Sequence, residues 1–335
     1  MESVLVTGGA GFIGSNIAEA LLLRGYRVVV LDDLSTGSMQ NILALQDYDN
    51  LKFIHGSILD AGLLRSIIKT ESISLVSHQA AVPSVSKSVK DPLTTIGVNV
   101  TGTTTLFQTA AEYGCKRIVF ASSSSVYGDT AELPKREGMS LNPKSPYAVS
   151  KASKEMLARV FSNLYDLEIV GLRYFNVYGR RQNPASDYAA VIPTFITRAL
   201  RNEPLPIEGD GMQTRDFSYI DDVVSANLQA LTRNVIQGNI FNIAYGERIT
   251  VLDLAELIRR EARSSSEIVY RPKRSGDVRD SLADVTLART QLAYEPRFPI
   301  QQGIVETISW YRTMSSRRCG FSEKPIPLSH NAQNA

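Results

Sequence analysis

The sequence is poor in the residues that hold small secreted proteins or metal centres together. Its 335 residues include two cysteines, Cys115 and Cys319, and three histidines, His55, His78 and His330. Two cysteines cannot form a disulfide framework or a thiolate cage, and the histidines share no spacing typical of metal ligands. We therefore expect no metal, and a location in a reducing compartment, the cytoplasm.

An excess of charge of one sign is also absent. Lysine and arginine number 36, aspartate and glutamate 34, so the formal net charge is +2. Nucleic-acid-binding proteins usually concentrate basic residues in a stripe, and no block of like charge is visible here. This composition predicts no nucleic-acid partner.

The sequence also lacks a long purely apolar run. The longest uncharged stretch, 92–111, approaches the length of a membrane span. It holds seven threonines, two glycines and Asn99, which favours a buried helix with a polar stripe. The first apolar run, from Val4, follows no basic segment and is interrupted by glycines, so we expect no signal peptide and no membrane partner.

Short β-branched runs alternate with stretches of helical length in the first half of the chain. The expected strands are 4–6, 28–31, 51–54, 74–77, 117–121 and 169–174, and the expected helices are 14–24, 63–69, 93–113 and 147–164. This alternation predicts an α/β fold, a Rossmann-type doubly wound parallel sheet with helices on both faces.

The composition of the sequence changes after about Asn176, where glycine and proline become frequent in expected loops. We predict a smaller, mixed α/β domain in this half. The predicted divisions are 1–175 for the first domain with returning segments near 216–245, 176–312 for the second, discontinuous domain, and 313–335 for a tail.

A glycine loop lies between the first expected strand and the first expected helix. Gly8, Gly11 and Gly14 give the spacing G-x-x-G-x-x-G, and Asp32 falls at the end of the second strand. Glycines let the backbone approach a pyrophosphate at a helix N-terminus, and a carboxylate at this point suits ribose hydroxyls and repels a 2′-phosphate. Each feature alone also suits an ordinary turn or a solvated strand end; together they predict NAD binding.

A serine, tyrosine and lysine constellation suggests proton transfer. Tyr147 and Lys151 lie one helical turn apart, and an ammonium beside a phenol lowers the pKa of the phenol. Tyr48 and Lys52 have the same spacing in a polar stretch without further candidate residues, so the spacing alone does not indicate a catalytic pair. The serines of 122–125 directly follow an expected strand, at the sheet edge where ligands bind.

Together these residues resemble the NAD-dependent epimerase/dehydratase family of extended short-chain dehydrogenases, from about residue 4 to 293. The resemblance implies that Ser123, Tyr147 and Lys151 are catalytic. It implies a cofactor site of Gly8, Gly11, Phe12, Ile13, Gly14, Asp32, Asp33, Ser57, Ile58, Gln79, Ala80, Ala81, Asn99, Tyr147, Lys151 and Tyr174. One departure is Ser57, where many members carry an aspartate that contacts adenine.

The second half resembles the members that bind nucleotide sugars. The implied substrate residues are Ser124, Ser125, Asn176, Ala190, Val191, Arg215, Arg274, Asp277 and Ser281. Two arginine forks suit a diphosphate, although either arginine alone would pass for a surface charge.

The pattern is more similar to UDP-hexose 4-epimerases than to dehydratases, because dTDP-sugar 4,6-dehydratases carry Thr-Asp-Glu where this chain has Ser123-Ser124-Ser125. Small Ser281 replaces a bulky tyrosine of many glucose-type enzymes, which favours N-acetylated UDP-sugars alongside UDP-glucose. A dehydratase, decarboxylase or reductase of the same scaffold, or a non-catalytic dinucleotide sensor, are the alternatives. The family resemblance also implies a homodimer packed through the 93–113 and 147–164 helices.

Overall fold

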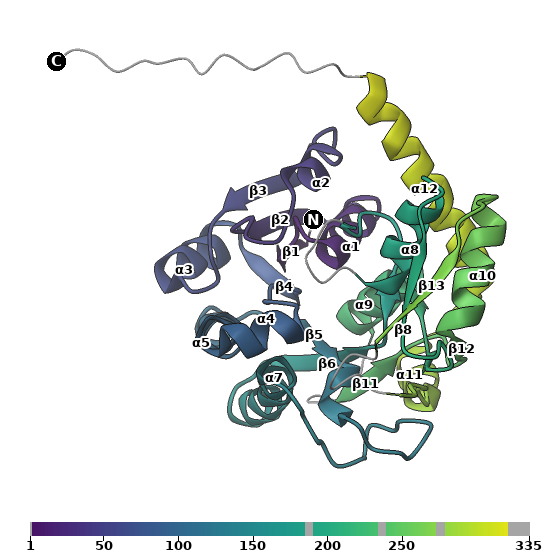
Figure 1. Cartoon of the computed structure of the whole chain (residues 1–335). Helices are drawn as coiled ribbons and strands as arrows, with labels where there is room; N and C mark the ends of the chain where they lie inside the picture. Colours follow the sequence, from purple (N-terminus) through teal and green to yellow (C-terminus); the bar gives the residue numbers. More distant parts are fainter. Residues whose placement is uncertain (1, 185–189, 234–238, 273–278, 321–335) are drawn as a thin grey trace.

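The computed structural model describes residues 2–184, 190–233, 239–272 and 279–320. A seven-stranded sheet in the order β11-β6-β5-β4-β1-β2-β3, with all its strand pairs parallel, forms the centre (Figure 1). Its strands are β1 (Ser3–Thr7), β2 (Arg27–Asp32), β3 (Leu51–His55), β4 (Ile73–His78), β5 (Arg117–Ser123), β6 (Glu168–Tyr174) and β11 (Ile240–Ile243). The predicted α/β fold class is confirmed.

Burial on both faces explains why the strands are continuously apolar. Side chains alternate along a strand, so Val4 and Val6 join one hydrophobic cluster and Leu5 joins the other. Helices α1 (Phe12–Leu22) and α9 (Ile220–Thr232) supply the first cluster. Helices α3 (Ala61–Thr70), α6 (Thr103–Glu112) and α7 (Pro146–Leu164) supply the second.

The strand order reverses between β1 and β4. The chain proceeds from β1 to β2 and β3 on one side, then returns to build β4, β5 and β6 on the other. In sheets of this kind the crevice at the carboxyl ends of the strands, beside the reversal, is where ligands bind. The glycine loop after β1 and the serines after β5 therefore meet at one edge.

The helix expected over 93–113 is divided. Helix α4 (Val85–Lys90) is followed by α5 (Pro92–Ile96), a π-helical turn η1 (Gly97–Gly102) and then α6. The Thr103 hydroxyl donates to the Asn99 carbonyl at 2.7 Å, and two further threonines make the same backbone contact one turn back. Such bonds compete with the regular helical ladder, and π-turns are frequent at functional sites.

The second half combines helices with three short ladders. Its helices are α8 (Val191–Ala199), α10 (Val251–Ala262), α11 (Thr286–Leu292) and α12 (Ile300–Gly320). The ladders pair β7 (Val177–Tyr178) with β10 (Ser218–Tyr219), β8 (Leu205–Glu208) with β13 (Ile268–Arg271), and β9 (Thr214–Arg215) with β12 (Ile249–Thr250). Two short helical segments, α2 (Met39–Leu43) and η2 (Ser124–Tyr127), complete the elements of the described chain.

Helix α12 corrects the predicted tail. It continues to Gly320, so the first residues of the segment expected to be a tail from 313 are helical. The end of α12 points away from the body of the molecule (Figure 1). Within the described ranges, none of the helices combines the length and apolar character needed to cross a membrane.

Candidate active site

A cavity of about 1070 Å³ lies at the carboxyl edge of the sheet. Residues after β1, β2, β4, β5 and β6 line it, together with the start of α7. Loops of the second half close the remaining side through Gln182, Asn183, Ala190, Arg215 and Ser281. The cavity exceeds the range usual for one drug-sized ligand, which gives room for a dinucleotide and a second nucleotide.

The glycine loop packs so closely that side chains are excluded. A Cβ atom on Gly8 would lie 2.6 Å from the Ala80 backbone nitrogen, and one on Gly14 would lie 2.2 Å from the Gly8 oxygen. Gly8 also adopts φ +69°, which favours glycine. Gly11 caps α1 without a side-chain hydrogen bond, so the first N–H groups of α1 face the cavity region and suit a pyrophosphate.

Asp32 ends β2 at the cavity wall. Its carboxylate accepts hydrogen bonds from the backbone nitrogens of Ala10 (2.9 Å) and Leu34 (2.8 Å). Burial raises the pKa of Asp32, and these two N–H donors oppose that shift. Each carboxylate oxygen retains a second lone pair, so the group can also accept from ribose hydroxyls.

The other residues expected around NAD mostly line the same cavity. They are Phe12, Ile13, Asp33, Ser57, Ile58, Gln79, Ala80, Ala81 and Tyr174. The Tyr174 hydroxyl lies 3.2 Å from the Gln79 amide oxygen and 3.0 Å from the Asn227 amide oxygen, and its single proton can be donated to either. These contacts fix the side chains after β4 and β6 relative to α9. The residues present fit a dinucleotide.

Asn99 does not line the cavity, in contrast to the expectation of a direct cofactor contact. It is fully buried in η1, where its amide pairs with the backbone of Val82 and donates to the Ser150 hydroxyl at 3.0 Å. Val82 does line the cavity. Asn99 therefore holds the cavity wall after β4 against α7.

Ser123, Tyr147 and Lys151 all line the cavity. Ser145 caps α7 by accepting from the Ala148 nitrogen, which places Tyr147 in the first turn of the helix. The Ser123 side chain lies close enough to Tyr147 to lower the pKa of its phenol. The Lys151 ammonium donates to the Ala121 carbonyl at 2.9 Å and lies 5.5 Å from the centre of the Tyr147 ring.

The pKa of Tyr147 differs from the sequence-based expectation. Burial raises it, and the Ser123 side chain opposes the shift. Lys151 is not among the groups that lower it. Burial also lowers the pKa of Lys151 to about 8, and the Glu155 charge opposes this shift. In the ligand-free protein, both groups are thus shifted toward their uncharged forms.

A layer of buried polar groups behind the trio was missed by sequence reasoning. Arg173 on β6 pairs with Glu155 on α7, and Lys154 lies 3.2 Å from His78. Burial, the Lys154 charge and the Lys151 charge hold the pKa of His78 well below its usual range. The sequence does not reveal these pairs, because the two members of each pair are distant from one another along the chain.

Only some of the substrate residues predicted in the second half line the cavity. Ser124, Ser125, Asn176, Ala190, Arg215 and Ser281 line the cavity. Val191 does not; it is partly buried in the first turn of α8, against the core. Arg274 and Asp277 lie outside the described residues. Asn176 has φ +35° and donates to the Asp216 carbonyl at 2.9 Å, which ties β6 to the Arg215 loop.

Several cavity residues were not among those predicted. They include Lys87, Lys135, Gln182, Asn183 and Asp280. Gln182 and Asn183 belong to the segment 179–184, Gly-Arg-Arg-Gln-Asn-Pro. No role for these two residues followed from the sequence pattern.

Comparison with known proteins places this site in a family. The model of the NAD dependent epimerase/dehydratase family matches residues 4–244. The chain therefore belongs to this family, and it uses NAD. A putative UDP-glucose 4-epimerase of Methanocaldococcus jannaschii is 38% identical over 310 residues, covering 92% of this chain and 98% of the relative.

Solved structures agree with this relationship. UDP-N-acetylglucosamine 4-epimerase of Methanobrevibacter ruminantium, in complex with UDP-N-acetylmuramic acid, superposes with TM-score 0.89 at 37% identity, covering 93% of this chain and 99% of that one. UDP-glucose 4-epimerase of Thermus thermophilus, in complex with NAD, gives TM-score 0.85 at 35% identity, covering 92% and 99%. Relatives at 33% identity include a UDP-N-acetyl-alpha-D-glucosaminuronate decarboxylase and a dTDP-glucose 4,6-dehydratase, so membership alone does not define the reaction.

Proposed function

We propose that the protein is an NAD-dependent 4-epimerase of UDP-sugars. It interconverts UDP-GlcNAc with UDP-GalNAc, and UDP-glucose with UDP-galactose, through a 4-keto form of the sugar. The observation that carries the proposal is the meeting of Ser123, Tyr147 and Lys151 in the same cavity as the glycine loop, beside a serine triplet that contains no acid. The epimerases among the relatives support it.

The proposed roles follow from the chemistry of the three side chains. Tyr147 takes the proton of the sugar 4-hydroxyl and returns it when the ketone is reduced. Ser123, which lines the cavity with Tyr147, binds the same sugar oxygen and relays this proton. The Lys151 ammonium orients the cofactor ribose and favours the Tyr147 phenolate once both are enclosed with ligand. NAD, when bound, supplies reversible acceptance of the C4 hydride, so the reaction has no net redox change.

The other proposed contacts divide between the two ligands. Gly8, Gly11 and Gly14 hold the pyrophosphate, and Asp32 accepts from the ribose hydroxyls. Phe12, Ile13, Asp33, Ser57, Ile58, Gln79, Ala80, Ala81 and Tyr174 enclose the rest of the dinucleotide. Asn176 and Arg215 hold the UDP end, with Ala190 beside the uracil and Arg274 and Asp277 as further contacts.

Two features set the preferred reaction and substrate within this proposal. Ser124 and Ser125 offer hydroxyls to the sugar but no carboxylic acid, so expulsion of a C6 hydroxyl, which a dehydratase requires, has no proton donor there. Ser281 is small and lines the cavity, which leaves room for a 2-acetamido group. The Thr214 carbonyl accepts from the Ser281 nitrogen at 3.2 Å, which fixes Ser281 against the Arg215 strand.

We further propose that the enzyme is a cytoplasmic homodimer. Large apolar side chains are exposed along one side of α7 and on the adjoining α4 and α5. They are Val89 (64%), Leu93 (84%), Met156 (62%), Val160 (50%) and Leu164 (69%). Exposed apolar side chains on helices that pack together are typical of an interface, and a second copy of the same helices would cover them. Cys115 is buried with a free thiol, which suits a reducing compartment.

The proposal is tested with purified protein and UDP-GlcNAc, or separately UDP-glucose, without added NAD, following the sugar protons by NMR. Appearance of the 4-epimer is expected. A product that has lost water or carbon dioxide would instead identify a dehydratase or decarboxylase. Bound NAD without turnover of either sugar, even after NAD is added, would contradict the assigned reaction and revive the sensor alternative.

A further inference from the structure

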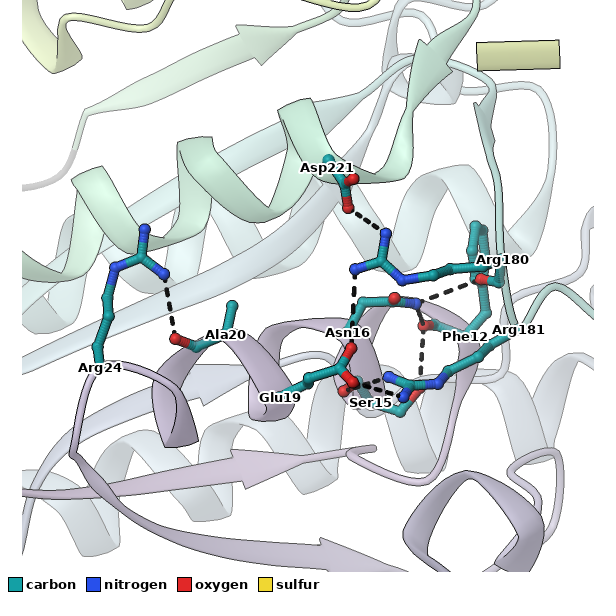
Figure 2. Close-up of polar contacts among 9 residues, drawn as sticks. All are labelled: Phe12, Ser15, Asn16, Glu19, Ala20, Arg24, Arg180, Arg181 and Asp221. Atoms are coloured by element: carbon teal, nitrogen blue, oxygen red, sulfur yellow. Dashed lines mark hydrogen bonds and ion pairs between the residues drawn. The ribbon is translucent and has the colours of Figure 1, made fainter. Parts of the chain in front are cut away.

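An ionic network joins helix α1 to the loop 179–184 and to helix α9 (Figure 2). The Glu19 carboxylate of α1 pairs with Arg181 at 3.0 Å and with Arg180 at 3.7 Å. Arg180 also pairs with Asp221 in the first turn of α9. Arg181 donates in addition to the Ser15 carbonyl at 3.1 Å. Two cations and two carboxylates thus balance one another in a single cluster.

The cluster is sheltered enough to constrain geometry. Side-chain exposure is 9% for Arg181, 25% for Glu19 and 28% for Arg180. Ion pairs at the open surface contribute little because water and salt screen them, whereas a guanidinium that is nine-tenths buried pairs in a less screened environment. Removing Glu19 would leave Arg181 enclosed without its carboxylate.

The backbone of the loop needs such support. Arg181 adopts φ +67°, a left-handed conformation that a non-glycine residue rarely takes without outside contacts. The Asn16 amide donates to the Arg180 carbonyl at 3.3 Å, and the Tyr311 hydroxyl of α12 donates to the Gln182 carbonyl. Most of the side-chain contacts that fix this turn therefore come from one face of α1.

The same helix and the same loop both reach the cavity. The N-terminus of α1 lines it through Phe12 and Ile13, and the loop lines it through Gln182 and Asn183. The Gln182 amide nitrogen donates to the Val177 carbonyl at 3.2 Å. The Gln182 oxygen is buried and has no hydrogen-bond partner within the described residues. Gln182 is therefore held with a free acceptor at the cavity wall.

We infer that Glu19 and Arg181 are positioning residues for the epimerase reaction: through them, the helix that receives the cofactor pyrophosphate sets the place of the loop that bounds the sugar side of the cavity. Neither residue lines the cavity itself. The inference rests on the proposed function for its substrate, but the ionic network and the loop geometry stand independently of it. It gives the segment 179–184 a role that its sequence pattern did not reveal.

The test compares Glu19→Ala and the milder Glu19→Gln with the unmodified enzyme. For Glu19→Ala we expect kcat/KM for the UDP-sugar to fall about tenfold, chiefly through KM, because displacement of a binding loop by about an ångström is costly. NAD bound per chain should stay unchanged. Glu19→Gln retains an acceptor for Arg181 and should recover part of the loss, and Arg181→Lys should resemble Glu19→Ala because one ammonium cannot reproduce both contacts.

Glu168→Ala provides the matched control. Glu168 pairs with Arg117 where β5 and β6 begin, at the edge of the sheet opposite the cavity, and its exposure of 34% is close to that of Glu19. It should lower stability without raising KM. Equal KM for Glu19→Ala and the unmodified enzyme would overturn the inference. If the unmodified enzyme turns over no UDP-sugar, the proposed function fails. Calorimetric titration with UDP then tests the network separately. Weaker UDP binding by Glu19→Ala than by the unmodified protein supports the positioning role, and equal binding refutes it.

Discussion

Arg173 on β6 and Glu155 on α7 form a two-point ion pair beneath the proposed catalytic trio. The Arg173 Nε and Nη2 atoms lie 2.9 and 2.7 Å from the two Glu155 carboxylate oxygens. Both side chains are buried, with 4% and 6% exposure. Ser122 donates to the same carboxylate at 2.5 Å, and Arg173 also donates to the Tyr127 hydroxyl at 2.6 Å. This pair fixes α7, and with it Tyr147 and Lys151, against the sheet.

Removal of Glu155 should therefore be severely destabilising. Glu155→Ala leaves the Arg173 guanidinium buried without its carboxylate, and we expect a loss of about 3–5 kcal/mol in the free energy of unfolding. Urea denaturation at pH 7 measures it. Glu256→Ala removes the half-exposed pair with Arg259 and should cost less than about 1 kcal/mol. Similar losses in the two variants would contradict this account of the buried pair.

The fold was predictable because local pattern and burial agree in its first half. Continuous apolar runs such as 4–6 and 28–31 are typical of strands covered on both faces, and the glycine loop indicated where β1 ends and α1 begins. The division of 93–113 was not predictable, because the threonine hydroxyls that bond backbone carbonyls suit both a regular helix and a π-turn. The helical continuation past Arg312 was missed because a polar sequence carries no apolar period.

Tyr147→Phe tests the proposed base. Loss of the phenolic oxygen removes the group that exchanges the proton of the sugar 4-hydroxyl, so we expect kcat to fall about 10²–10⁴-fold, with NAD still bound. Tyr48→Phe is the control, because Lys52, its partner in spacing, instead pairs with Glu71 at 2.7 Å. The NMR assay with UDP-GlcNAc measures both variants. Substantial turnover by Tyr147→Phe would refute the assignment.

The cofactor site could be predicted at positions where binding requires one particular type of residue at the end of a particular strand. Gly8, Gly14 and Asp32 fall in this class, because backbone approach and hydroxyl recognition leave few choices of side chain. The pKa of Tyr147 was not predictable from spacing. Its direction depends on burial, which follows from contacts across the fold.

Asp216 should make stability decrease as pH rises from about 4 to 7. Burial raises its pKa to about 7, although backbone nitrogens of Ala283, Gly246 and Tyr245 donate to it. Between the unfolded and folded pKa values, the folded state binds more protons than the unfolded state, so raising pH favours unfolding. The shift corresponds to about 4 kcal/mol.

Asp216→Asn isolates this contribution. The difference in free energy of unfolding between the unmodified protein and the variant, measured by urea denaturation from pH 4 to 8, should fall with pH and level off above about 7. Loss of the acceptor makes a further contribution that does not depend on pH. A difference that is constant over this range would show that Asp216 has an ordinary pKa in the folded protein.

Ser281→Tyr should change the choice of substrate. A phenol at this position fills the part of the cavity proposed to receive the 2-acetamido group, so turnover of UDP-GlcNAc should fall relative to UDP-glucose. One contact of this size typically changes discrimination by about 1–3 kcal/mol, or about 10–200-fold in the ratio of kcat/KM values. Competition between the two sugars in one NMR tube measures the ratio directly. Ser281→Ala, which keeps the side chain small, should leave it nearly unchanged, and an unchanged ratio in Ser281→Tyr would remove Ser281 as the basis of specificity.

Val160→Glu should dissociate the proposed homodimer. Val160 lies with Met156 and Leu164 on the exposed side of α7, and Leu93 adjoins them from α5. If a second copy covers this surface, a carboxylate at its centre is buried without a partner, and that cost opposes association. Sedimentation at several protein concentrations should then show a dimer for the unmodified protein and a monomer for the variant. Leu43→Glu places the same charge on exposed α2, outside this surface, and should remain dimeric. A monomeric unmodified protein, or a Val160→Glu variant that still associates, would exclude this surface as the interface.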